Sequence, residues 1–316
     1  MKTKAKKGLT ALVLGGGAAR GMAHIGVLEV FEKAGLEFDM IVGTSMGALV
    51  GGLYAAGAQL EEIERAIVDM PWKRVVSYFR LNLKGGGLVD GKAVVKALET
   101  ILADTKIEDF PVRFAAVSVD VRTGERVVLQ TGSAVTAIRA SISVPGAFMP
   151  VMDGGRALVD GGVMEPVPAP TARELGATCV IAVNVLDHPA KRHLTGKWAH
   201  HAERKDRDAP SRRTAASRGQ WRDKILAFTQ KIAHKRRERR AKKGTGPWLG
   251  SVLWNSMRII QYSLSEYQMR EADVVVEPDL GDVLPSEFYR GKECIEAGRK
   301  AARQALPDVL KALGKA

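Results

Sequence analysis

The chain has 316 residues, 46% of them apolar, which is enough for one large α/β domain or two small ones. Its two cysteines, Cys179 and Cys294, argue against a disulfide framework and against a cysteine-rich metal site. The formal charge of +13 is uneven: residues 188–247 hold 19 basic and 5 acidic side chains, a net +14, and the rest sums to −1. Any argument from net charge therefore concerns this one segment.

Neither a secretory signal nor a membrane span is expected. Residues 1–7 are basic like the start of a signal peptide, but the apolar run behind them, residues 9–14, is too short for a secretory core. The longest apolar stretch elsewhere, residues 248–264, is broken by Asn255, Arg258 and Gln261. The sequence therefore predicts a cytoplasmic protein, and a peripheral position on the inner face of the cell membrane extends that expectation.

Strands and helices are predicted to alternate along the chain. Apolar runs and period-two alternation predict strands over residues 11–14, 38–42, 113–121, 125–130, 147–151, 156–159, 180–186 and 274–276. Helical spacing predicts helices over residues 25–34, 46–56 and 286–313. Turns are predicted at residues 122–124 and 153–155. This alternation is typical of an α/β domain with a mainly parallel sheet.

The basic segment interrupts this pattern. Residues 187–247 contain clusters such as the run 235–240 (KRRERR) and little apolar periodicity, so they are predicted to be a partly disordered insertion. The remaining residues, 1–186 and 248–316, are predicted to form a single domain. Within the insertion, the spacing of Trp221, Ile225, Phe228 and Ile232 predicts one basic amphipathic helix over residues 220–240.

A serine between two glycines follows the second predicted strand. The stretch Gly43-Thr44-Ser45-Met46-Gly47 has the pattern of a nucleophile elbow, which holds a serine hydroxyl exposed on a sharp strand-to-helix turn. An ordinary strand-to-helix connection is the alternative, because glycine and serine are common in turns. A nucleophilic serine also needs a base and an oxyanion hole.

The base is not expected to be a histidine. Five of the six histidines lie in the basic insertion, and His24 on the first helix is interpreted as satisfied by local hydrogen bonds. A carboxylate acting directly on the serine remains. Asp160, at the end of a short apolar strand, and Asp153, seven residues earlier, are both followed by two glycines, and spacing alone does not choose between them.

The glycine triplet after the first strand suits an oxyanion hole. Gly15-Gly16-Gly17 matches neither a dinucleotide fingerprint, which would need glycine where Arg20 stands, nor a phosphate-binding loop. Consecutive glycines before a helix leave backbone amides free to converge on an anion. Arg20 would either add positive charge there or pair with a nearby carboxylate.

Taken together and in order, the three motifs resemble the patatin-like phospholipase family. The flanking stretches "AHIGVLEVFEKAGL", "IRASISVPGAFMPV" and "LVDGGVMEPVP" are also similar to that family, over about residues 9–186 and 250–302. The basic insertion has no counterpart in the family pattern. The resemblance implies a three-layer α/β/α domain with a serine–aspartate dyad that needs no metal or cofactor.

The resemblance also implies a role for each matching residue. Ser45 is the expected nucleophile and Asp160, rather than Asp153, the expected base. The expected site comprises the elbow residues Gly43, Thr44, Met46 and Gly47, the oxyanion-hole residues Gly15, Gly16, Gly17 and Arg20, and the base-turn residues Gly161 and Gly162.

The expected activity is hydrolysis of a lipid ester through an acyl-enzyme, by a phospholipase, lysophospholipase or esterase. An acyltransferase with the same elbow is the nearest alternative, and the failed fingerprints argue against a nucleotide-binding module. The basic insertion is expected to bind an anionic membrane surface. Nucleic acid is not an expected partner, because Trp198 and Trp221 are too sparse for a stacking platform.

Overall fold

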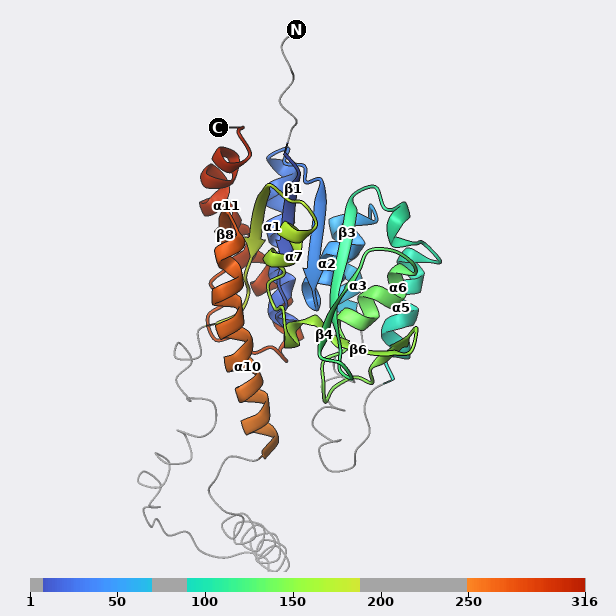
Figure 1. The fold of residues 1–316 in the computed structure, drawn as a ribbon. Helices are drawn as coiled ribbons and strands as arrows, with labels where there is room; N and C mark the ends of the chain where they lie inside the picture. The colour runs from blue at the N-terminus through green and yellow to red at the C-terminus, as the bar shows by residue number, and fades with distance from the viewer. Residues whose placement is uncertain (1–7, 70–89, 188–248, 316) are drawn as a thin grey trace, which may run out of the picture. The chain divides into compact units, whose positions relative to one another are not determined.

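The computed structural model describes residues 8–69, 90–187 and 249–315 (Figure 1). Contacts divide the chain into two units, one formed by Met1–Pro189 with Met257–Ala316 and the other by Ala190–Ser256. The helix predicted over residues 220–240, and almost all of the insertion predicted over 187–247, lie outside the described residues. The division of the chain at 186 and 248 therefore stays a prediction. No described helix has the length and hydropathy needed to span a bilayer.

The core of the first unit is one mixed sheet of eight strands. The strands are β1 (Thr10–Leu14), β2 (Met40–Thr44), β3 (Arg113–Asp120), β4 (Glu125–Leu129), β5 (Val151–Asp153), β6 (Arg156–Asp160), β7 (Cys179–Val183) and β8 (Val274–Val276). Hydrogen bonds connect them in the order β5-β6-β3-β2-β1-β7-β8, and β4 also pairs with β3. The five strands from β3 to β8 in this order are parallel, and β4, β5 and β6 pair antiparallel.

The predicted strands are confirmed with one exception. A strand was expected over residues 147–151, but the chain there forms a turn, and β5 begins only at Val151. The amides of Ala147 and Phe148 both donate to the carbonyl of Val144, so they are not available for strand pairing. Apolar character alone does not reveal this local turn.

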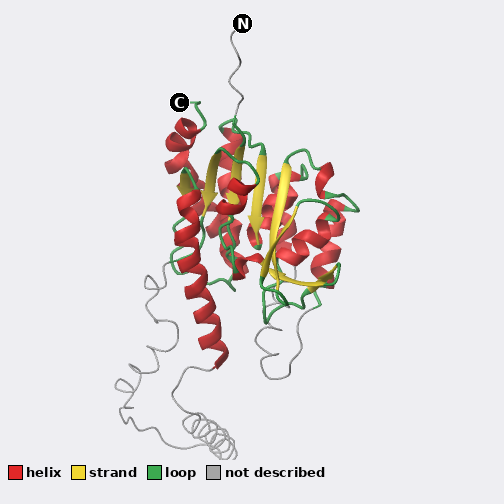
Figure 2. Cartoon of the chain, viewed as in Figure 1, coloured by secondary structure: helices red, strands yellow, loops and turns green. Residues whose placement is uncertain are grey.

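Helices cover both faces of the sheet (Figure 2). The described α-helices are α1 (Ala23–Lys33), α2 (Met46–Ala55), α3 (Leu60–Asp69), α5 (Lys92–Leu102), α6 (Ala134–Ser141), α7 (Ala169–Glu174), α10 (Leu249–Gln268) and α11 (Gly291–Ala312). The third predicted helix, over residues 286–313, begins later than expected, at Gly291, after a single 3₁₀ turn.

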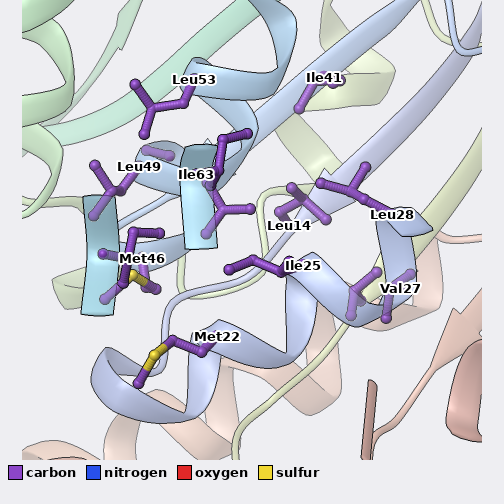
Figure 3. Close-up of a cluster of buried hydrophobic side chains, with 14 of the residues drawn as sticks. Leu14, Met22, Ile25, Val27, Leu28, Ile41, Met46, Leu49, Leu53 and Ile63 are labelled. Carbon is purple, nitrogen blue, oxygen red and sulfur yellow. The ribbon is translucent and has the colours of Figure 1, made fainter. Parts of the chain in front are cut away.

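Alternate side chains of the strands enter two separate cores. Leu14 and Ile41 face the larger core, where they meet α1, α2 and α3 (Figure 3). Val13 and Val42, one position earlier and later along their strands, face the smaller core under α7. A sheet buried on both faces explains the nearly continuous apolar runs of its strands. The architecture is the expected three-layer α/β/α domain with a mainly parallel sheet.

The long strand β3 brings two distant strand ends together. Its first half pairs with β2 up to Thr44, opposite Val117, and its last three residues pair with β6 down to Asp160, opposite Ser118. Because β4 occupies the other edge of β3, β2 and β6 lie on the same edge and meet end to end. The residue after β2 and the last residue of β6 are therefore neighbours.

Candidate active site

Ser45 lies on a sharp turn between β2 and α2. Its backbone has φ 55° and ψ −121°, a conformation that costs a non-glycine residue about 1–3 kcal/mol. Glycine at position 47 permits the turn, because a Cβ there would lie 1.9 Å from the carbonyl oxygen of Leu14. Helix α2 thus begins in direct contact with β1. A nucleophile elbow needs a strained, closely packed turn of this kind.

The side chains of Ser45 and Asp160 are hydrogen-bonded. The Ser45 hydroxyl donates to Asp160 Oδ2 over 2.6 Å, and the amide of Gly162 donates to Asp160 Oδ1 over 2.7 Å. Both side chains are buried, Ser45 with 7% of its surface exposed and Asp160 with 2%. Burial raises the pKa of Asp160 to about 6, and the bonds from Ser45 and Gly162 oppose this increase. The carboxylate is thus a stronger base than an exposed aspartate.

Asp153 lies elsewhere. It ends β5, in the hairpin with β6, and forms an ion pair with Arg156 at 2.5 Å. Its neighbours Gly154 and Gly155 both have positive φ, as a tight hairpin turn requires. Asp153 is therefore a turn residue, and Asp160 is the carboxylate that contacts Ser45.

The glycine loop after β1 passes close to Ser45. A Cβ on Gly16 would lie 3.3 Å from the Cβ of Ser45. In contrast to what the motif predicted, two of the three amides are already engaged: the Gly15 amide donates to Val183 over 3.0 Å and the Gly16 amide to Pro166 over 2.8 Å. Within the described residues, the Gly17 amide donates to no backbone carbonyl. The amide available to an anion is therefore that of Gly17.

Arg20 forms an ion pair instead of facing Ser45. It is almost fully buried, its guanidinium pairs with Asp187, and its Nε donates to the carbonyl of Val185 over 2.8 Å. Of the two roles considered for Arg20, the structure thus places it with a carboxylate. It attaches the short helix after the glycine loop to the chain that leaves β7.

His24 supports the glycine loop through a hydrogen bond to its backbone. Its Nε2 lies 2.7 Å from the carbonyl oxygen of Gly15, so Nε2 carries the proton and donates. Burial lowers the pKa of His24 to about 4, which keeps the ring neutral at pH 7. The expected local hydrogen bond forms at Nε2, but the other ring nitrogen, Nδ1, is buried and has no hydrogen-bond partner among the described residues, so this histidine is only partly satisfied. The Ser45 hydroxyl donates to Asp160 and not to His24.

Several polar residues that hold the site were not predicted. Ser141 Oγ accepts the Ser45 amide over 3.0 Å and donates to the carbonyl of Val117 over 2.6 Å. The hydroxyl of Thr44, whose role was also unassigned, donates to the carbonyl of Glu165 over 2.8 Å. Ser141 stands in the quoted stretch "IRASISVPGAFMPV", but a serine in a helical stretch gives no sign of which distant amide it will accept.

No group of three or more histidine, cysteine, aspartate or glutamate side chains in the described part of the chain is arranged to hold a metal ion. The polar groups around Ser45 are the Asp160 carboxylate, the Ser141 hydroxyl and backbone amides. A carboxylate at hydrogen-bond distance can take the proton of the serine hydroxyl. A base of this kind is one requirement of acyl transfer through a serine.

Comparison with known proteins identifies the family of the chain. The family model of patatin-like phospholipases matches residues 12–173, half of the chain. An NTE family protein of Mycobacterium tuberculosis is 30% identical over 328 residues, 94% of this chain and 91% of that protein.

Two longer relatives match only part of the chain. The lysophospholipase NTE1 of Debaryomyces hansenii is 35% identical over 55% of this chain and 12% of its own length. Human patatin-like phospholipase domain-containing protein 6 is 34% identical over 55% of this chain and 13% of its own length. The solved structure of VipD from Legionella pneumophila aligns at a TM-score of 0.47 with 14% identity, over 96% of this chain and 67% of that one. The family-model match over residues 12–173 and the Mycobacterium tuberculosis relative show that the chain belongs to the patatin-like phospholipase family of lipid ester hydrolases.

Proposed function

We propose that the chain hydrolyses lipid esters through a Ser45–Asp160 dyad and a covalent acyl-enzyme. The observation that carries the proposal is the 2.6 Å hydrogen bond from the Ser45 hydroxyl to Asp160 Oδ2, on a backbone strained to φ 55°. A buried serine held this way by a carboxylate of raised pKa has the base that a nucleophile needs.

In the first step, Asp160 takes the proton of the Ser45 hydroxyl as Oγ attacks the ester carbonyl carbon. The carbonyl π electrons move to the oxygen and form a tetrahedral oxyanion. When this intermediate collapses, the bond to the alcohol or lysolipid breaks and Asp160 returns its proton to that leaving oxygen. Ser45 then carries the acyl group as an ester.

In the second step, Asp160 takes a proton from a water molecule that attacks the acyl-enzyme. Collapse of the second tetrahedral intermediate breaks the bond to Oγ, which recovers the proton from Asp160. The products are a fatty acid and the free enzyme. An acyltransferase would place an acceptor alcohol where this water attacks, so product analysis with and without added alcohol separates the two activities.

The oxyanion is assigned to two backbone amides. One is the amide of Met46, the first residue of α2, where the amides point out of the helix and the positive end of its dipole lies. The other is the amide of Gly17, which donates to no described backbone carbonyl. An elbow enzyme uses this combination of the residue after the nucleophile and a loop amide. Each such donor contributes about 3–4 kcal/mol to the transition state.

Replacement of the serine tests the dyad. Ser45→Ala removes Oγ alone, so p-nitrophenyl ester hydrolysis and fluorophosphonate labelling should both be lost with an unchanged circular dichroism spectrum. Ser143→Ala is the matched control, since this buried serine bonds Arg139 and not Ser45. Substantial ester turnover by purified Ser45→Ala protein would contradict the proposal.

We further propose that the enzyme acts at an anionic membrane surface. The support is the charge of +14 within residues 188–247, since a basic residue close to an anionic bilayer contributes about 1 kcal/mol. The described helix α10, which follows this segment, exposes Ile259, Ile260 and Tyr267 by 50%, 55% and 67%. Exposed apolar side chains that follow a basic segment in the sequence suit shallow insertion into a bilayer.

A lysophospholipid is the substrate class that the comparisons favour within this proposal. The support is that the Debaryomyces hansenii relative is a lysophospholipase. Release of fatty acid from lysophosphatidylcholine, compared with release from the matching diacyl lipid in the same vesicles, tests it. Faster hydrolysis of the diacyl lipid would favour a phospholipase.

A further inference from the structure

Two glutamines of α10 hold the chain that follows Asp160. Gln261 Nε2 donates to the carbonyl of Gly162 over 3.0 Å. Gln268 Nε2 donates to the carbonyl of Met164 over 2.8 Å, and its Oε1 accepts the amide of Val167 over 3.1 Å. The two glutamines stand seven residues apart, two helical turns, so they lie on one face of α10. This face of the helix therefore contacts residues 160–167, here called the Asp160 segment, at three points.

The Asp160 segment contacts every other part of the site. Besides the bond from Ser45 to Asp160, its Glu165 carbonyl accepts the Thr44 hydroxyl and its Pro166 carbonyl accepts the Gly16 amide, both over 2.8 Å. A shift of this segment would move the base, the elbow and the glycine loop relative to one another. Whatever fixes the segment therefore fixes the site.

Gly162 connects Gln261 to the carboxylate within one residue. Its amide donates to Asp160 Oδ1 and its carbonyl accepts Gln261 Nε2. A Cβ on Gly162 would lie 2.9 Å from Gln261 Nε2 and 3.0 Å from Asp160 Oδ1. The two side chains therefore leave little room for any side chain at position 162. The glutamine, the glycine and the aspartate are thus in continuous contact.

The chemistry of the amide side chain matters at position 268. One end of Gln268 must donate to a carbonyl and the other must accept from an amide, and this pair of contacts fixes the orientation of the group. Methionine has a similar size but no donor, and glutamate has no donor when ionised. Gln268 is 6% exposed, so water cannot easily replace the lost bonds.

We propose that Gln261 and Gln268 are positioning residues for the Ser45–Asp160 pair, through which α10 holds the base against the nucleophile. The inference rests on the proposed function, because it takes Asp160 as the base. Neither glutamine touches the reacting atoms. Their effect reaches Asp160 through the backbone of the Asp160 segment.

The proposal predicts a change in the base itself. The hydrogen bond from Gly162 lowers the pKa of Asp160 and partly offsets the effect of burial. If loss of the Gln261 contact loosens Gly162, this bond weakens and the pKa of Asp160 rises. The acidic limb of the activity profile should then move to higher pH, which a merely structural role would not produce.

The test compares full-length Gln261→Met and Gln268→Met with the wild type and with Gln304→Ala, an exposed glutamine of α11. Two properties are measured: kcat and KM for a soluble short-chain ester, and the pKa of the Asp160 carboxyl by carbon-13 NMR in the resting protein. We expect kcat to fall about tenfold in both Met variants, less than the roughly 100-fold loss that a full 1 Å misplacement causes, with KM within twofold and the Asp160 pKa raised. Gln304→Ala should match the wild type.

An unchanged Asp160 pKa and an unchanged kcat in Gln261→Met would overturn the proposal. Gln261 is half-buried, so Gln261→Met keeps the test decisive even if Gln268→Met fails to fold. The NMR comparison needs no turnover. A raised carboxyl pKa in a protein whose wild type neither hydrolyses esters nor reacts with a fluorophosphonate would uphold the positioning contact and refute the proposed function.

Discussion

The hydrogen bond between Ser45 and Asp160 connects two residues with opposite requirements. In the proposed dyad the nucleophile Ser45 must be reachable by the substrate, yet Asp160 is buried, and burial of an ionised carboxylate costs free energy. The bonds from Ser45 and Gly162 offset only part of that cost, so the pKa stays near 6. The site therefore gains a base that titrates close to neutral pH at the expense of some stability.

The raised pKa predicts the pH dependence of the reaction. Asp160 can accept a proton only when it is ionised, so kcat/KM should rise with pH through an acidic limb with an apparent pKa of about 6. The pH–rate profile of a short-chain ester measures this limb. A limb near pH 4, the range of an exposed aspartate, would contradict the burial argument.

Asparagine at position 160 should separate activity from stability. It keeps a hydrogen bond to each partner but cannot take a proton, so Asp160→Asn should lose nearly as much activity as Ser45→Ala. Asp153→Asn should have a mild effect, because this aspartate pairs with Arg156 on the hairpin. His24→Ala should keep the reaction with Ser45 even if the protein becomes less stable. Equal losses of ester hydrolysis at Asp153 and Asp160 would mean that the base has been wrongly assigned.

The same substitution should change stability with pH. A carboxyl whose pKa is raised in the folded state stabilises the fold below its unfolded pKa of 3.8, and this contribution is lost as pH rises through about 6. Asp160→Asn should therefore melt at a higher temperature than the wild type at pH 8, and this gain should vanish below pH 4. The shift corresponds to about 3 kcal/mol at most. Thermal unfolding at both pH values measures it.

At the scale of elements, the elbow depends on how closely α2 approaches β1. A Cβ at position 47 would meet the Leu14 carbonyl oxygen at 1.9 Å, a backbone atom that cannot move without shifting the strand. One turn further along α2, a Cβ on Gly51 would meet side-chain carbons of Ile41 and Leu14 at 2.8 and 3.0 Å. The side chains of Ile41 and Leu14 can rotate away from such a Cβ, whereas the Leu14 carbonyl oxygen can move only with its strand.

The two glycines should therefore respond differently to alanine. Gly47→Ala should destabilise the protein by about 3 kcal/mol or more and abolish fluorophosphonate labelling, because the elbow must move. Gly51→Ala, its matched control in the same helix, should destabilise the protein less, since the better helix propensity of alanine stabilises the helix by about 1 kcal/mol. Urea denaturation gives both values. Similar destabilisation by the two variants would show that the backbone contact is not decisive.

At the scale of the first unit, the site lies where the parallel strands end. The glycine loop follows β1, and Ser45 follows β2. Strand β1 pairs with β2 along one edge and with β7 along its other edge. Open parallel sheets bind their ligands at this kind of junction, at the carboxyl ends of the strands. β6 enters antiparallel and supplies Asp160 from the opposite direction.

The whole chain should bind anionic vesicles through its basic segment. Replacing the five basic residues of the run 235–240 with glutamine removes five positive charges, so vesicle binding should weaken strongly and lose most of its dependence on salt. Deleting residues 190–244 should abolish binding. Hydrolysis of a soluble short-chain ester should survive both changes.

Co-sedimentation with phosphatidylserine vesicles at low and physiological salt measures this binding, and phosphatidylcholine vesicles are the control. Binding that is unchanged by the deletion would refute the membrane hypothesis. Tighter binding to DNA than to vesicles at physiological salt would instead identify nucleic acid as the partner of the segment.

Much of the fold, and the proposed pairing of Ser45 with an aspartate, was predictable from the sequence. Strand and helix periodicity is local, and glycines at a sharp turn reveal themselves by composition, so the elbow at Ser45 and the loop after β1 were found directly. The choice of Asp160 over Asp153 needed the family resemblance, because both aspartates precede two glycines and spacing carries no information about which one reaches Ser45.

Only the tertiary structure decided which polar groups meet. The engagement of the Gly15 and Gly16 amides, the pairing of Arg20 with Asp187 and the contacts of Gln261 and Gln268 all join residues that lie far apart in the sequence. Such partners depend on the register of the sheet and on the path of the helices across it. A hydrogen bond is directional and forms within a few tenths of an ångström, whereas the apolar pattern that specifies the fold tolerates many such arrangements.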